Sequence, residues 1–231
     1  QRFVIITLFV LAYFSICGQN TGPGGVANSS TLQVWLDASK LSLSDTDPVS
    51  QWGDSSGNNN HFTQTNDPSF RPEFRSNSII NSGPGVRFVK DFLYSSSIPS
   101  LETNDLSWVI IFQTSTLSPM QVLLRSNYTS GAGSPAGHKT FWGSYITDNS
   151  NITTISHIRN SNNSFQQGSH VFGSGNTNSL ITINENTSSF KSYANGSLIA
   201  NVSGTNTTPN GHNFTILGSD SYVSNLPQRA F

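Results

Sequence analysis

Carboxylate side chains, which cleave glycosidic bonds in many enzymes, are widely separated in this sequence. A carboxylate nucleophile and a carboxylic acid that share this reaction lie about 5 Å apart, as a Glu-x-Asp-x-x-Glu strand would place them. The three glutamates stand instead at Glu73, Glu102 and Glu185. Glu102 and Asp105 are close to each other, but their segment is typical of a solvated turn. We therefore predict that the chain is not an enzyme, while aspartate pairs brought together by the fold stay open.

The sequence also lacks the residue spacing that is typical of other common catalytic and metal sites. The sequence has no Gly-x-Ser-x-Gly motif of a serine nucleophile. No histidine or cysteine pair has the spacing of a zinc site. The histidines are scattered among glycine, serine and asparagine: His61, His138, His157, His170 and His212.

The segment from Asp54 to Asn60 (DSSGNNN) is rich in oxygen-bearing side chains around Gly57. Calcium takes about six to eight oxygen ligands from carboxylates, amides and carbonyls, and Asp54, Asn58 and Asn60 are candidate ligands. The segment lacks the bidentate glutamate of an EF-hand loop. In the alternative interpretation, Asp54 and Asn58 bind the backbone of their own turn. The sequence leaves both a structural Ca²⁺ site and a hydrogen-bonded turn open.

A second candidate site lies between residues 126 and 145. A glycan site needs an exposed aromatic ring beside hydrogen-bonding groups. Trp142 and Tyr145, with Tyr128 and His138 near the glycine-rich loop, are the candidate glycan-binding residues. The alternative for Trp142 and Tyr145 is packing in the core. The remaining tryptophans lie in strand-like apolar contexts and are predicted core residues: Trp35, Trp52 and Trp108.

The composition indicates an all-β protein that does not bind nucleic acid. The chain has 231 residues, of which 10% are charged, with a net charge of −1 and no run of lysine or arginine. Nucleic acid and anionic membrane surfaces both require a basic patch. Serine, threonine, asparagine and glycine are abundant, and no sustained helical period follows residue 20. The length fits one large β domain.

The first residues have the pattern of a targeting segment. Arg2 precedes an apolar run from Phe3 to Ile16, the length of a signal-peptide core. We predict a signal peptide at residues 1–18, a flexible lead-in at 19–30, and a secreted or cell-surface protein. Cys17 is the only cysteine, so no disulfide framework is expected. The alternative is that Cys17 receives a lipid anchor.

Alternating residues and turn signals predict a series of short strands. The predicted strands include Leu32–Asp37, followed by a loop over 38–50, and Leu106–Gln113, whose apolar run indicates a central strand covered on both faces. A Gly/Ser-rich loop is expected from Ser126 to Thr140. Asn195-Gly196 predicts a two-residue hairpin turn. The other predicted strands are 61–64, 71–74, 85–89, 92–95, 122–125, 141–145, 152–159, 179–184, 188–195, 197–202 and 214–218.

Three segments resemble the laminin-G/concanavalin A-like domains of secreted Bacteroidetes proteins. They are LQVWLDAS with VSQWGDSSGNNN at the start, GPGVRFVKDFLYSSS, and SFKSYANGSLIA followed by FTILG. The resemblance implies an antiparallel two-sheet jelly-roll sandwich over residues 31–231, a fold that often holds structural calcium. In the family a further closing strand follows, so we expect residues 229–231 to begin it and an open sheet edge where it belongs.

The resemblance favours a non-catalytic recognition module that binds a glycan or a surface protein in adhesion. Two alternatives stay open because one fold hosts many functions. The first is a structural spacer domain of a multidomain surface protein. The second is a divergent glycoside hydrolase, since the related fold includes glucanases.

Overall fold

The computed structural model describes residues 31–78, 82–89, 91–96, 98, 106–113, 121–129, 138–147, 153–159, 165–168, 177–185, 189–203 and 212–218. These residues form strands, turns and two short 3-10 helices, with no α-helix among them. Within this part of the chain, no helix is long and apolar enough to cross a membrane. The predicted signal peptide, the lead-in, Glu102, Asp105 and residues 229–231 lie outside the described residues. The predicted all-β class is confirmed.

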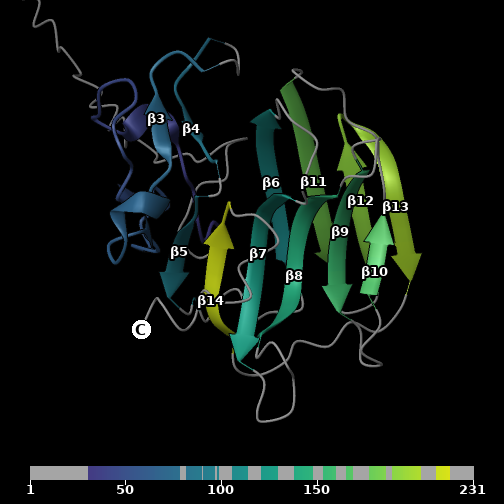
Figure 1. Ribbon diagram of the computed structural model, residues 1–231. Helices are drawn as coiled ribbons and strands as arrows, with labels where there is room; N and C mark the ends of the chain where they lie inside the picture. Colours follow the sequence, from purple (N-terminus) through teal and green to yellow (C-terminus); the bar gives the residue numbers. More distant parts are fainter. Residues whose placement is uncertain are drawn as a thin grey trace, which may run out of the picture.

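Two antiparallel sheets face each other in the larger part of the fold (Figure 1). The eight-stranded sheet has the order β1-β2-β5-β14-β7-β8-β9-β10, and the four-stranded sheet behind it has the order β13-β12-β11-β6. A third sheet pairs β3 with β4. The bounds are η2 Ala38–Lys40, β1 Gln51–Trp52, β2 Phe62–Thr63, η3 Pro68–Phe70, β3 Glu73–Arg75, β4 Gly85–Arg87, β5 Leu93–Ser96, β6 Leu106–Gln113, β7 Gln121–Thr129, β8 His138–Thr147, β9 Thr153–Arg159, β10 Phe165–Gly168, β11 Thr177–Glu185, β12 Ser189–Ala194, β13 Ser197–Ser203 and β14 His212–Leu217.

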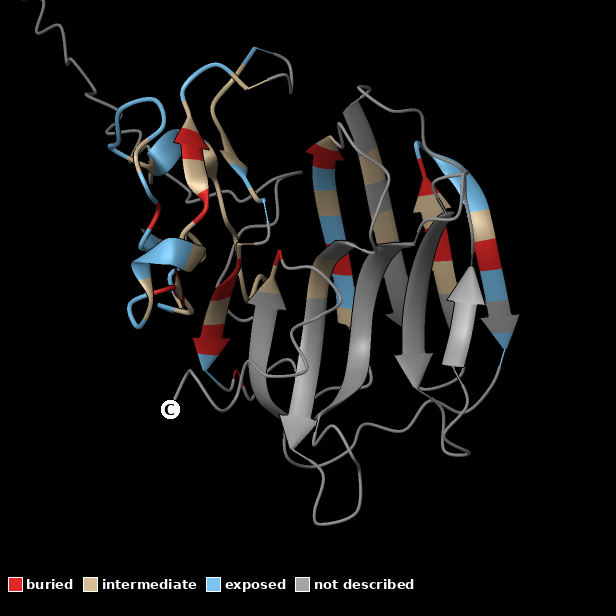
Figure 2. Cartoon of the chain, viewed as in Figure 1, coloured by how far each residue is buried: buried red, intermediate tan, exposed pale blue. Residues whose placement is uncertain are grey.

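Strand β6 has the predicted bounds but not the predicted environment. Trp108 and Phe112 are buried, whereas the alternate residues Val109 and Ile111 are 62% and 51% exposed. The alternation is visible along β6 in Figure 2. Among the described strands, β6 pairs only with β11 and ends the four-stranded sheet. The prediction of a central strand covered on both faces is therefore wrong.

The core between the sheets forms where β7 packs against the four-stranded sheet. The register of β7 against β8 shifts between Val122 and Leu124, so that Leu123 is an additional residue on β7. Leu124 packs against the cluster that contains Trp108, and Leu123 packs against the cluster that contains Phe112. The shift lets two consecutive residues of one strand face the opposite sheet.

A second core lies under the first part of the chain. Val49, Phe62, Phe74 and Leu93 are at most 4% exposed and form one cluster. Burying side chains of this kind stabilises a fold by about 1.5 to 3 kcal/mol each. Partly buried neighbours from five segments surround them, so this cluster joins the N-terminal loops to the sheets: Val34, Leu36, Leu41, Trp52, Val86, Phe88 and Leu217.

The segment Leu32–Asp37 is extended, but it is not a full strand. Leu36 forms an isolated bridge with Asp54, and the 3-10 helix η2 begins directly after Asp37. Val34 and Leu36 do pack against the core, as their alternation predicts. No neighbouring strand runs along this segment in the described part of the fold. Its backbone forms hydrogen bonds with the loop of residues 54–60 instead.

Two turn predictions have different outcomes. Asn195 and Gly196 have φ angles of 49° and 81°, so the predicted hairpin between β12 and β13 is confirmed. The predicted loop from Ser126 to Thr140 is too long at both ends, because β7 continues to Thr129 and β8 begins at His138. Cross-strand pairing extends the strands beyond the points where the turn residues begin.

Candidate functional site

Asp54 is the centre of a hydrogen-bonded loop rather than a free carboxylate. Its Oδ1 atom accepts from the backbone N–H of Trp35 at 2.8 Å and of Ser56 at 2.9 Å. Its Oδ2 atom accepts from Ser56 Oγ at 2.7 Å and from the N–H of Asn60 at 3.0 Å. The N–H of Asp54 itself donates to His61 Nδ1. The carboxylate therefore joins its own loop to the extended segment at Trp35.

The two asparagines bind the same segment through their amide nitrogens. Asn58 Nδ2 donates to the carbonyl of Leu32 at 2.9 Å, and Asn60 Nδ2 donates to the carbonyl of Gln33 at 2.8 Å. These bonds satisfy the backbone of a segment that has no ladder partner in the described part of the fold. They explain why polar side chains concentrate at this position.

The geometry of this loop favours the hydrogen-bonded interpretation over a calcium site. An ionised carboxylate has about four lone-pair positions, and four donors already occupy those of Asp54. A calcium ion at Asp54 would have to displace donors that position Trp35 and Asn60.

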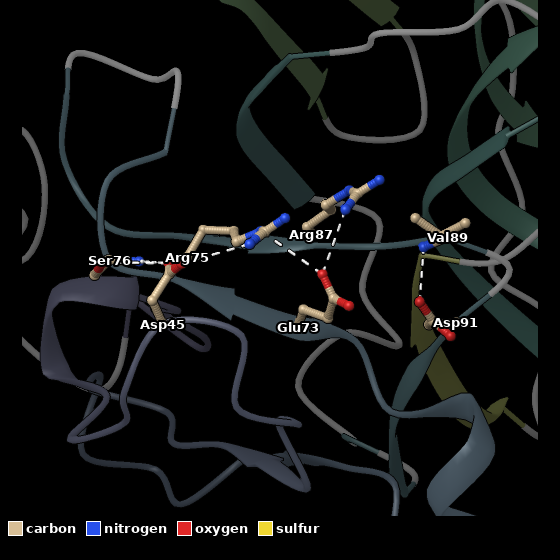
Figure 3. A network of polar contacts seen from close by, with 7 residues as sticks. All are labelled: Asp45, Glu73, Arg75, Ser76, Arg87, Val89 and Asp91. Atoms are coloured by element: carbon tan, nitrogen blue, oxygen red, sulfur yellow. Dashed lines mark hydrogen bonds and ion pairs between the residues drawn. The ribbon is translucent and has the colours of Figure 1, made fainter.

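The charged residues of β3 and β4 form an exposed network (Figure 3). Glu73 Oε2 lies 3.6 Å from Arg75 Nε and 3.4 Å from Arg87 Nη1, and Arg75 also reaches Asp45 at 3.5 Å. Exposed pairs of this kind contribute about 0 to 1 kcal/mol each. Burial raises the pKa of the nearby Asp91 above its usual value, and the charge of Glu73 adds to this. The network therefore contributes only modestly to the stability of this surface.

The four predicted glycan-binding residues all lie on β7 and β8, where the structure describes the backbone but not their side chains. Tyr128 pairs with Lys139 and Thr129 with His138, so Tyr128 and His138 are neighbours at the end of this strand pair. Trp142 pairs with Ser126 and Tyr145 with Val122, farther along. The register therefore separates the four positions into two groups.

Trp142 and Tyr145 belong to opposite faces of the eight-stranded sheet. Leu124, which packs against the four-stranded sheet, pairs with Ser144. Trp142 is two positions from Ser144 and shares its face, whereas Tyr145 is one position away. Hence position 142 belongs to the inner face, the one next to the core, and position 145 belongs to the outer face.

Register also brings together three positions that were not singled out in the sequence. Arg125 pairs with Gly143, and Gly143 pairs with His157. Arg125 follows the inward Leu124, so this row lies on the outer face together with Tyr145. In Figure 1 no described element covers the outer face of β7, β8 and β9. No local motif could have identified Arg125 and His157, because only the strand pairing makes them neighbours.

Comparison with known proteins yields loose structural similarity only. No protein-family model matches the chain, and no significantly similar curated protein was found. The CBM40 domain of a Ruminococcus gnavus IT-sialidase, bound to α2,3-sialyllactose, is 15% identical over 57% of this chain and 86% of that domain, with a TM-score of 0.35. At this TM-score the similarity assigns no ligand to this chain.

Two toxin domains show similarity of the same kind. The binding domain of botulinum neurotoxin DC, in complex with SialylT, is 12% identical over 70% of this chain, with a TM-score of 0.41. The binding domain of Paraclostridial Mosquitocidal Protein 1 is 10% identical over 80% of this chain, with a TM-score of 0.44. This chain covers 41% and 49% of those structures, less than half of each.

Proposed function

We propose that this chain is a non-catalytic, carbohydrate-binding jelly-roll module of a secreted or cell-surface protein. The observation that carries the proposal is the outer face of β7, β8 and β9. It places an aromatic residue, Tyr145, on the same face as Arg125 and His157, and no described element covers it. An aromatic ring packs against the apolar face of a sugar, while arginine and histidine hydrogen-bond with its polar groups.

The positions of the glutamates support the non-catalytic part of the proposal. Glu73 lies on β3 between two arginines, and Glu185 lies at the end of β11 in another sheet. A retaining glycosidase needs two carboxyl groups about 5 Å apart. Their placement on strands of different sheets supports a non-catalytic role for this pair. The export of the module is supported by the signal-peptide pattern of residues 1–18.

Two aromatic substitutions test the proposal against a purely structural role. We expect Tyr145→Ala to weaken glycan binding about tenfold and to change the free energy of unfolding by less than about 0.5 kcal/mol, as is usual on a surface. Trp142→Ala, at an inner-face position, should destabilise the fold instead. Glycan microarrays and urea denaturation of the purified chain and both variants measure these effects.

The outcomes separate the candidate functions. A chain that binds no sugar would contradict the proposal and leave the structural spacer. Hydrolysis of a bound oligosaccharide, detected by chromatography of the products, would contradict the non-catalytic assignment and favour a glycoside hydrolase.

A further inference from the structure

The strands of the eight-stranded sheet carry only basic charges. The chain as a whole has 12 acidic residues and 11 lysines and arginines. None of the acidic residues lies in β1, β2, β5, β7, β8, β9, β10 or β14. Seven of the twelve lie between residues 31 and 96, outside these strands. The same strands contain three basic residues and three histidines: Arg125, Lys139, Arg159, His138, His157 and His212.

Two of these residues flank a glycine on the outer face. The row runs from Arg125 on β7 through Gly143 on β8 to His157 on β9. Neighbouring strands lie about 4.8 Å apart, so the backbones at Arg125 and His157 are separated by about 10 Å. The residue between them has no side chain. Tyr145 follows two positions along β8, and Arg159 follows two positions along β9, on the same face.

We propose that this row is a subsite for an acidic sugar, one that carries a carboxylate or a sulfate. The inference rests on the proposed function, because it names the ligand class of that same face. An arginine guanidinium binds a carboxylate or sulfate through two parallel hydrogen bonds, and a histidine adds a third donor. The glycine between them adds no side chain to the row, and no acidic residue in the sheet's strands opposes the anion.

The first test compares matched sugars on the purified chain. The probes are lactose, sialyllactose and sulfated lactose, together with oligogalacturonate and its methyl ester, measured by titration calorimetry. We expect each acidic probe that binds to do so at least about tenfold more tightly than its neutral counterpart. Comparing the probes that carry a carboxylate with sulfated lactose shows which anion is preferred. Equal affinity for neutral and acidic probes would overturn the subsite but leave the proposed function. Binding of no sugar would overturn both.

Substitutions locate the anion-binding group. Arg125→Gln should remove the preference for acidic sugars, and Arg125→Lys should retain part of it because lysine keeps the charge but not the planar fork. His157→Gln is a second variant in the same row. Lys191 lies on β12 in the other sheet, away from the row. Lys191→Gln also removes one positive charge, and it should leave the affinity for every probe unchanged. Equal effects of Arg125→Gln and Lys191→Gln in folded proteins would contradict the assignment.

Discussion

Replacing Asp54 with alanine should lower the free energy of unfolding by about 4 kcal/mol. The substitution removes an acceptor with four hydrogen bonds, one of which reaches the backbone of a distant segment at Trp35. Hydrogen bonds to a charged group contribute about 1.5 to 3 kcal/mol each when removal leaves the donors unpaired. The site is only partly buried, so the full sum is not expected. Urea denaturation at neutral pH measures the change.

Asp67→Ala is the matched control for this effect. Asp67 accepts from the N–H and the hydroxyl of Ser69 at an exposed helix start. Removing a cap of this kind costs about 1 kcal/mol. Equal losses at Asp54 and Asp67 would contradict the central role of the Asp54 loop.

The same denaturation experiment distinguishes the two interpretations of the loop. We expect the midpoint of wild-type unfolding to be the same in excess calcium and in EDTA. A calcium ion bound at 100 times its dissociation constant would stabilise the fold by about 2.7 kcal/mol. A shift of that size with calcium but not with magnesium would show that the loop of Asp54, Asn58 and Asn60 binds calcium.

Gly218→Ala should destabilise the fold by about 3 kcal/mol. A Cβ atom at this position would overlap the ring of Phe88, which packs against the Val49 and Phe62 cluster. Overpacking of this kind costs about 1 to 3 kcal/mol. Gly218 also has a φ angle of 70°, which disfavours any residue with a Cβ by about 1 kcal/mol.

Gly57→Ala separates the two causes of the stability loss expected at Gly218, which are the overlap with Phe88 and the positive φ angle. Gly57 has a φ angle of 94°, but a Cβ there would meet nothing within 4 Å. Its substitution should therefore cost only the free energy of placing a Cβ at a positive φ, about 1 kcal/mol. Thermal or urea unfolding of both variants gives the difference. If the two variants lose the same stability, contact with Phe88 is not what requires glycine at 218.

Local sequence patterns predicted the strands and turns of this fold, but not which strands pair or pack against one another. Alternation and turn residues predicted most strands, and Asn195-Gly196 predicted its hairpin because both positions need a positive φ. Strand β6 shows the limit. Its apolar run is compatible with burial on both faces, yet Val109 and Ile111 are exposed at the end of a sheet. Which strand covers a face depends on contacts between distant segments.

The candidate sites illustrate the same limit. The oxygen-rich composition around Asp54 identified an organised loop, but the partners of that loop are backbone groups between Leu32 and Trp35, which no motif reveals. On β8, Trp142 and Tyr145 looked equivalent in sequence, and only the pairing through Ser144 assigns them to different faces. Arg125 and His157 became neighbours only through Gly143.

The most direct test of a glycan site on the outer face is to map where a sugar binds. Backbone amide chemical shifts of the isotope-labelled chain, followed during titration with the tightest-binding probe, give that position. We expect the largest changes at Arg125, Gly143, Tyr145 and His157, with little change on the four-stranded sheet. Changes concentrated instead around the exposed Val109 and Ile111 of β6 would contradict it.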